Sequence, residues 1–270
     1  MGCGAHYHSG WCNIDLVSNA PEVIKYDIRS GLPFRDNSFD AAYHSHVLEH
    51  LTPEQGEALI KECYRVLKPG GILRIVVPDL EQISRIYLEM LTKAWNGDKA
   101  SEKNYEWMKL ELLDQMVRHQ SGGLMGPYMV DSEKDNADFV RSRIGSELNS
   151  CQSQQRSSKA PSLRNWWAHQ KQRLSVKLIS CLLGREKASA LSEGIFRQQG
   201  EIHRWMYDRY SLKMLCNRCG FSDFHVCRAN QSTIDNFPEF QLDTLHDQVR
   251  KPDSLFVECQ KQATSAARAA

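Results

Sequence analysis

The sequence predicts an α/β protein whose core is a mostly parallel β-sheet. The first observation is a strand–helix–strand pattern over residues 37–79, with an apolar strand at 39–43 and a β-branched strand at 72–77. The second is a pair of short upstream strands, each with an aspartate near its carboxyl end. The third is a helix followed by two strands near the end of the chain. Strands that alternate with helices are typical of a parallel sheet.

The helix between the first two strands is well delimited by the sequence. Thr52 can accept a backbone N–H as the N-cap, and Pro53 has its φ pre-set for the first helical position. Gln55 can complete a capping box. Apolar residues recur at helical spacing over 58–67, and the LKPGG segment ends the helix. We therefore predict a βαβ unit with parallel, buried strands.

The remaining segments extend this pattern on both sides. Upstream, strands are predicted at 12–16 and 23–28. Downstream, an amphipathic helix precedes strands at 224–229 and 254–260, which are joined by a polar loop and should pair antiparallel. Between the two blocks, residues 81–200 are polar and largely helical in pattern, with a Ser/Gln-rich seam near 149–162. This stretch is predicted to be an insertion that caps the site.

Composition narrows the class of protein. A chain of 270 residues with 41% hydrophobic content can bury a full core, and a net charge of +1 argues against nucleic acid as a partner. There is no apolar run of membrane-spanning length and no signal-peptide core, which predicts a cytoplasmic protein. Nine cysteines without regular spacing indicate reduced thiols. Cys216 and Cys219 form a CxxC, but no second pair stands at zinc-finger spacing.

Several motifs occur in a specific order: GCG at 2–4, NIDL at 13–16, DIRSGLPFRDNSFDAAYHSHVLEHL at 27–51 and LKPGGILRIVVPDL at 67–80. Together they resemble the class I S-adenosylmethionine-dependent methyltransferases, in particular the type-11 group. The similarity covers residues 2–80 and returns over 203–260. It implies a Rossmann-like sheet, S-adenosylmethionine as the cofactor and methyl transfer as the activity.

The resemblance also implies a domain organisation and a set of cofactor contacts. Residues 1–80 and 201–262 would form the methyltransferase domain around a helical insertion or lid at 81–200, with a disordered tail at 263–270. The family pattern places the glycine motif at the methionine part of the cofactor, one aspartate at the ribose, another acid at the adenine and a histidine at the reaction centre. The matching residues here are Gly2, Cys3, Gly4, Asp15, Asp27, Ile28 and His44. Without the resemblance, the same residues read as turn glycines, capping acids and a packed histidine.

His46, Glu49 and His50 fall at helical spacing and can converge on one point, which suits a divalent metal or a proton relay. Methyltransferases that use this cluster for a metal carry glutamate at the first position, and no fourth ligand is evident, so we predict no metal. For a general base, the order of preference is His44, then His46, then His203, which opens the segment that returns from the insertion.

The start of the chain is unusual. Only Met1 precedes the glycine motif, although the family pattern requires a central apolar strand there. We expect the reading frame to begin upstream, and residues 1–270 alone to be poorly soluble or free of cofactor, because the neighbouring strands would present unpaired edges. The other reading is a cofactor-binding relic or truncated fragment that no longer catalyses. A nicotinamide enzyme is disfavoured because Tyr7 stands where a third glycine is needed.

Two features bear on the acceptor. The link from Ala5 to Trp11 is too short for a full crossover helix, and it resembles the link of methyltransferases encoded with glycan-assembly genes. This favours a sugar or lipid-linked glycan intermediate as the small-molecule partner. Residues 156–187 carry eight Lys/Arg against one acid, and 163–183 read as a basic amphipathic helix. That helix predicts peripheral membrane contact or a phosphorylated substrate, or else a lid helix packed on the core. The oligomeric state is not predicted.

Overall fold

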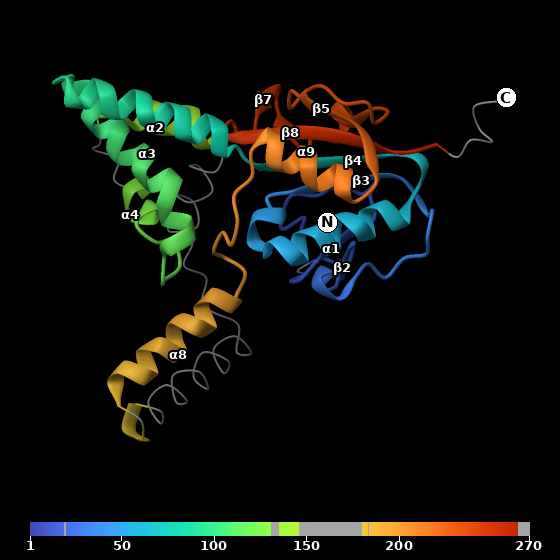
Figure 1. The fold of residues 1–270 in the computed structure, drawn as a ribbon, viewed down its shortest axis with the longest axis horizontal. Helices are drawn as coiled ribbons and strands as arrows, with labels where there is room; N and C mark the ends of the chain where they lie inside the picture. The colour runs from blue at the N-terminus through green and yellow to red at the C-terminus, as the bar shows by residue number, and fades with distance from the viewer. Residues whose placement is uncertain (19, 131–134, 146–179, 183, 264–270) are drawn as a thin grey trace. The chain divides into compact units, whose positions relative to one another are not determined.

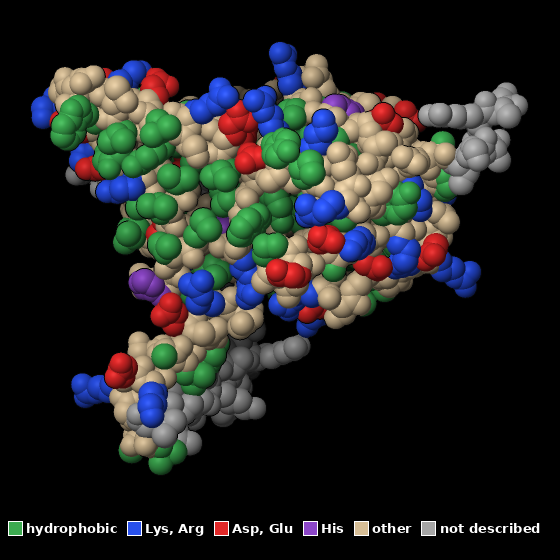
Figure 2. All heavy atoms as spheres, viewed as in Figure 1, with side chains coloured by type: hydrophobic (Ala, Val, Ile, Leu, Met, Phe, Trp, Pro, Cys, Tyr) green, Lys and Arg blue, Asp and Glu red, His purple; other side chains and the backbone are tan. Residues whose placement is uncertain are grey.

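A computed structural model describes residues 1–270 except 19, 131–134, 146–179, 183 and 264–270 (Figure 1). The chain forms two compact units. The first comprises residues 1–89, 142–145 and 204–270, and the second comprises 90–141 and 146–203. No helix among the described residues has the length and apolar character of a membrane span. Lys, Arg, Asp and Glu side chains are spread over the face that Figure 2 shows.

The first unit contains a sheet in two main parts. β1 (Asn13–Asp15) pairs in parallel with β2 (Val23–Lys25). The larger part has the order β3-β4-β8-β5, with bounds β3 (Phe39–Ser45), β4 (Leu67–Pro78), β8 (Ser254–Lys261) and β5 (Phe221–Cys227). β3 and β4 are parallel, and β8 is antiparallel to both of its neighbours. The α/β class, the parallel unit and the antiparallel closing pair are therefore confirmed. A short hairpin of β6 (Thr244–Leu245) and β7 (Gln248–Val249) lies in the loop between β5 and β8.

Met1 and Gly2 lie between the two parts of the sheet. The amino group of Met1 donates to the carbonyl of Tyr43 on β3 at 2.9 Å, and the amide of Gly2 donates to the carbonyl of Ile14 on β1 at 2.8 Å. Burial lowers the pKa of this amino group. Met1 also lines a largely apolar cavity, together with Ile14, Leu32, Phe34, Phe39, Ala41, Tyr43 and Val66 among others. Met1 and Gly2 thus connect β3 and β1 through backbone hydrogen bonds.

α1 (Pro53–Val66) begins with the predicted capping box. Thr52 Oγ1 accepts the amide of Gln55 at 3.3 Å, and the Gln55 side chain accepts the amide of Thr52 at 3.1 Å. The helix ends as expected, but β4 begins at Leu67 instead of Ile72. The reason is a register shift: Leu67 pairs with Phe39 before the regular ladder starts at Ala41 and Ile72. Gly70, with φ +81°, lies in this irregular stretch.

The faces of the sheet are covered by different elements. α1 and α9 (Arg209–Arg218) pack on one face, where they meet Leu73, Ile75 and Val77 of β4 (Figure 1). Asp208 caps α9 with its own capping box. Because strand side chains alternate, the intervening residues of β4 point to the opposite face, which the loop between β5 and β8 covers with a cluster around Phe237. This loop contains the 3₁₀ turn η3 (Phe237–Phe240).

The second unit is helical in its described part. It contains α3 (Lys99–Val117), α4 (Met125–Val130) and α8 (Arg185–Gln198). α2 (Leu80–Trp95) and α5 (Ala137–Ile144) each contribute residues to both units. Trp107 is fully buried, donates to Glu111 at 2.7 Å and has its ring 5.5 Å from that of Tyr128. The predicted seam at 149–162, most of the basic helix at 163–183 and nearly all of the tail lie outside the described residues.

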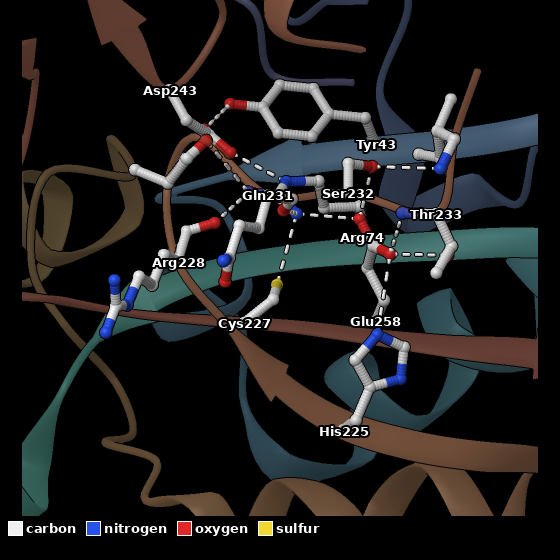
Figure 3. Close-up of polar contacts among 12 residues, drawn as sticks. Tyr43, Arg74, His225, Cys227, Arg228, Gln231, Ser232, Thr233, Asp243 and Glu258 are labelled. Atoms are coloured by element: carbon white, nitrogen blue, oxygen red, sulfur yellow. Dashed lines mark hydrogen bonds and ion pairs between the residues drawn. The ribbon is translucent and has the colours of Figure 1, made fainter. Parts of the chain in front are cut away.

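Arg74 of β4 anchors the loop between β5 and β8 from within the protein (Figure 3). Its side chain is fully buried and forms ion pairs of 2.7 Å with Asp243 and 2.6 Å with Glu258. Its guanidinium also donates to the carbonyl of Gln231 at 2.9 Å and stacks on the ring of Phe237 at 4.5 Å. The donors of the guanidinium are thus directed to the loop, to Cys227 at the end of β5 and to Glu258 on the neighbouring β8.

Further hydroxyls complete the network around the two buried carboxylates. Tyr43 donates to Asp243 Oδ1 at 2.6 Å, and burial beside this carboxylate raises the pKa of the tyrosine well above its ordinary value. Ser232 and Thr233 donate to Glu258, whose pKa is lowered by these hydrogen bonds against the effect of burial. Two buried carboxylates are therefore balanced by one cation and several donors, and loss of the cation leaves both uncompensated.

We expect Arg74→Met to lower the free energy of unfolding by about 3–5 kcal/mol, the usual cost of leaving a buried ion partner unpaired. Urea unfolding followed by circular dichroism measures this change. Lys68→Ala is the matched control, because Lys68 pairs with the exposed Asp40 and such pairs contribute about 0–1 kcal/mol. Equal stabilities of the two variants would contradict the anchoring role of Arg74.

Candidate active site

The carboxyl ends of β1, β2, β3 and β4 carry most of the residues that the sequence analysis selected. Asp15 is the last residue of β1, Asp27 follows β2, and His46 follows β3. Gly2 is hydrogen-bonded to Ile14, which places the glycine motif beside the end of β1. In open α/β sheets, ligands bind outside the carboxyl ends of the strands. This edge is therefore the candidate active site.

The glycine motif and Asp15 are directly connected. Asp15 Oδ2 accepts the amide of Gly4 at 2.9 Å, and Oδ1 accepts the amide of Val17 at 2.9 Å. The two bonds fix the plane of the carboxylate at the end of β1. A carboxylate oxygen has more than one acceptor position, so both oxygens can still accept hydrogen bonds from a ligand. Two oxygens held in one plane match two neighbouring hydroxyls, such as those of a ribose.

The two glycines are required for different reasons. Both have left-handed backbone, with φ +61° at Gly2 and +55° at Gly4. A Cβ built on Gly2 would overlap the Cγ2 methyl of Val47, so Gly2 permits close packing within the protein. A Cβ on Gly4 would meet no atom within 4 Å. The backbone of Cys3 and Gly4 is therefore accessible to a ligand, whereas Gly2 packs against Val47.

Asp27 is held by its neighbour Arg29. The guanidinium forms an ion pair with the carboxylate at 2.7 Å, and the amide of Arg29 donates to Oδ1 at 3.0 Å. These hydrogen bonds lower the pKa of Asp27, so the carboxylate is charged throughout the neutral range. Ile28, next in the chain, is partly buried against the main core. A charged acceptor and an apolar side chain thus lie side by side after β2.

His44 lies on β3 and is fully buried. Neither ring nitrogen has a hydrogen-bond partner within the described part of the chain. Burial, reinforced by the positive N-terminus and opposed by Glu49, lowers the pKa of His44 from 6.5 to about 3. The imidazole is therefore neutral at physiological pH and a weak proton acceptor. These properties suit a wall of the site better than a general base.

His46 is the histidine with an acid–base environment. Its Nδ1 lies 3.1 Å from Glu49 Oε1, and its Nε2 lies 2.9 Å from the Oγ of Ser254. His50 Nε2 lies 3.9 Å from the same carboxylate oxygen. Glu49 belongs to the 3₁₀ turn η2 (Leu48–His50) that precedes α1, and its side chain is 1% exposed. The spacing in the sequence predicted that His46 and Glu49 lie close together, but no motif indicated that Ser254 would contact His46.

Two further features that the sequence singles out are His203 and the Cys216–Cys219 pair. His203 belongs to the second unit, where it is buried and its amide donates to the carbonyl of Gln115 at 2.9 Å, so its catalytic role stays a prediction. Cys216 and Cys219 are buried in the main core as free thiols. Burial raises the pKa of Cys219 to about 11, which keeps this thiol protonated and unreactive.

Comparison with known proteins finds similarity to methyltransferases over part of the chain. Residues 8–75 match the family model described as a methyltransferase domain. A ubiquinone/menaquinone biosynthesis C-methyltransferase of Klebsiella pneumoniae is 37% identical over 140 residues, which are 49% of this chain and 53% of that protein. A probable tRNA methyltransferase 9B of Mus musculus is 30% identical over 126 residues, 40% of this chain and 28% of that protein. The chain thus spans about half the length of its curated relatives, or less.

Solved structures of the same class show weaker overall similarity. A methyltransferase of Thermotoga maritima described as a possible histamine N-methyltransferase has a TM-score of 0.34 at 15% identity, and covers 89% of this chain and 63% of its own. A methyltransferase of Archaeoglobus fulgidus has a TM-score of 0.34 at 12% identity, with 92% and 74% covered. Likeness at this level says nothing about the substrate. Residues 8–75 thus resemble the methyltransferase domain of S-adenosylmethionine-dependent enzymes, and the cofactor that this domain implies is S-adenosylmethionine.

If Asp15 accepts the ribose hydroxyls, Asp15→Ala should weaken S-adenosylmethionine binding by about 1.5–3 kcal/mol, the range for hydrogen bonds to a charged group. Isothermal titration calorimetry measures the affinity. Asp40→Ala is the control, because Asp40 lies near the start of β3, at the opposite end of the strand. Unchanged affinity in a folded Asp15→Ala protein would reject the assignment.

The buried His44 should make the protein sensitive to acid. Between the folded pKa of about 3 and the unfolded value near 6.5, the unfolded chain binds more protons, so the free energy of unfolding falls as pH falls. From about pH 7.5 to about pH 5, wild type should lose about 2 kcal/mol more than His44→Gln, at about 1.4 kcal/mol per unit. Denaturant titrations at both pH values measure the difference. Equal losses would show that His44 is not buried as a neutral ring.

Proposed function

We propose that this protein transfers the activated methyl group of S-adenosylmethionine to a small or medium-sized acceptor at the carboxyl edge of the sheet. The observation that carries the proposal is the bond between Gly4 and Asp15. It sets an open glycine backbone and a ribose-type acceptor side by side, and His46 with its carboxylate partner follows β3 at the same edge. The methyltransferase-domain match over residues 8–75 supports the same chemistry.

The donor set at this edge fits each part of the cofactor. Asp15 would accept the ribose hydroxyls, and the backbone of Cys3 and Gly4 would lie along the methionine part, with Gly2 behind it. Asp27 has acceptor positions beyond those used by Arg29, so it would accept from the adenine amine while Ile28 contacts the ring. His44 would form part of the wall near the reaction centre.

For this reaction the protein has two tasks, which are to align the acceptor with the methyl group and to remove the proton of the acceptor. When bound, the cofactor supplies a sulfonium-activated methyl carbon, which the acceptor attacks while the sulfur keeps the electron pair of the broken C–S bond. The protein must hold the acceptor in line and take the proton of the acceptor group. We assign the proton to His46, since the low pKa of His44 makes that ring a poor acceptor. His203 remains a further candidate.

For the acceptor, we propose a sugar or a lipid-linked glycan intermediate. The support is the short link between Ala5 and Trp11, which resembles that of methyltransferases encoded with glycan-assembly genes. The relatives' names concern quinone biosynthesis and tRNA, and quinone precursors are the competing small acceptors. Membrane contact through residues 163–183 and a cytoplasmic location stay predictions.

The competing function is cofactor binding without catalysis. The observation that favours it is the burial of His44, because the lowered pKa makes this ring a poor proton acceptor. The two functions differ in a single observable, which is whether label leaves the cofactor and appears on an acceptor.

The test is incubation with methyl-labelled S-adenosylmethionine and panels of sugars, lipid-linked glycans and quinone precursors. We expect transfer to one panel, and His46→Ala should lower turnover by about 10²-fold or more while cofactor affinity is kept. His246→Asn, an exposed histidine of the β6–β7 turn, is the control. Tight cofactor binding with no labelled product from any panel would favour the non-catalytic function.

A further inference from the structure

We propose that Glu49 is a positioning residue that fixes the tautomer of His46, so that Nε2 presents a lone pair to the acceptor. This inference rests on the proposed function and extends it in one respect. A base with a fixed, unprotonated nitrogen implies an acceptor that must lose a proton on methylation, such as a hydroxyl group.

Both ring nitrogens of His46 are engaged. Nδ1 lies 3.1 Å from Glu49 Oε1, and Nε2 lies 2.9 Å from Ser254 Oγ. The side chain of His46 is 14% exposed, and that of Glu49 is 1% exposed. The imidazole is thus held on two sides in a nearly dry environment, with part of its surface open at the edge of the sheet.

The chemistry of the partners decides which nitrogen carries the proton. Glu49 Oε1 lies against Nδ1 at 3.1 Å, and a negative charge at this position favours the tautomer that carries its proton on Nδ1. Nε2 then has only a lone pair and must accept from the hydroxyl of Ser254. A second acceptor for this hydroxyl, Asp253 Oδ1, lies farther away at 3.4 Å. The sequence of donors therefore runs from Ser254 to His46 to Glu49.

The backbone reinforces this arrangement. His46 has φ +53°, a left-handed conformation that is uncommon for a non-glycine residue. Its amide donates to the carbonyl of Val76 on β4 at 2.9 Å, which holds the strained residue at the end of β3. Strained residues of this kind persist where the surrounding structure fixes them, and they concentrate at functional sites.

The arrangement has the form of a hydroxyl, a base and an orienting acid. The contact with Ser254 shows that a hydroxyl group can come within hydrogen-bond distance of Nε2. An acceptor hydroxyl that reaches the same nitrogen would meet a lone pair already directed at it. Glu49 has two effects on His46. It disfavours the tautomer with the proton on Nε2, and it stabilises the imidazolium that forms when Nε2 takes the proton of the acceptor.

The test measures the tautomer and the turnover separately. Nitrogen-15 NMR of histidine-labelled protein should show His46 protonated at Nδ1 and unprotonated at Nε2. In Glu49→Gln, whose amide can also donate, the His46 signals should shift toward the Nε2–H tautomer. Turnover with the acceptor found above should fall by about 10²-fold with little change in KM. Ser254→Ala should keep the Nδ1–H tautomer, because Glu49 still sets it.

Glu57→Gln is the matched control, since Glu57 lies on α1 in exposed pairs with Lys61 and Arg218. It should change neither the tautomer nor the turnover. An Nε2–H tautomer in wild type, or an unchanged tautomer in Glu49→Gln, would overturn the proposal. The NMR experiment tests the role of Glu49 even if no acceptor is methylated. Failure of the proposed function and failure of this inference are therefore distinguishable.

Discussion

The buried pairing of Arg74 with Glu258 is the interaction on which the first unit depends. The two residues lie directly opposite each other on β4 and β8, so their ion pair fixes the register of these antiparallel strands. A shift by one residue would turn the side chains of β8 to the wrong face and leave two charges without partners. With this register, Ser254 pairs with Pro78 at the carboxyl end of β4. The hydroxyl that contacts His46 is therefore placed by a charge pair in the middle of β8, four residues farther along the strand.

Burial assigns different tasks to two histidines that are two residues apart. His44 is enclosed without a hydrogen-bond partner among the described residues, and the low pKa that results keeps it neutral. His46 is almost as well enclosed, but a carboxylate and a hydroxyl hold its two nitrogens. His44 therefore contributes to the packing around the proposed site, whereas His46 can accept a proton at a fixed position. The two histidines lie on β3 and directly after it.

The sequence was sufficient for features that depend on neighbouring residues. The capping box of Thr52 and Gln55, the parallel unit around α1 and the antiparallel pairing of β5 with β8 follow from local patterns, and all are present. Features that join distant segments were not predictable. Arg74 meets partners 169 and 184 residues away, and His46 meets Ser254 across 208 residues. No periodicity or motif links such positions, because the fold alone brings them together.

We expect S-adenosylmethionine to bind at the edge formed by Gly4, Asp15 and His46. The most direct measurement is a crystal structure of the protein with S-adenosylhomocysteine. We predict that the ribose hydroxyls contact both oxygens of Asp15 and that the amino-acid part lies along Cys3 and Gly4. The sulfur should lie on the side of His46. Adenosine bound elsewhere, or a ribose held by residues other than Asp15, would contradict this prediction.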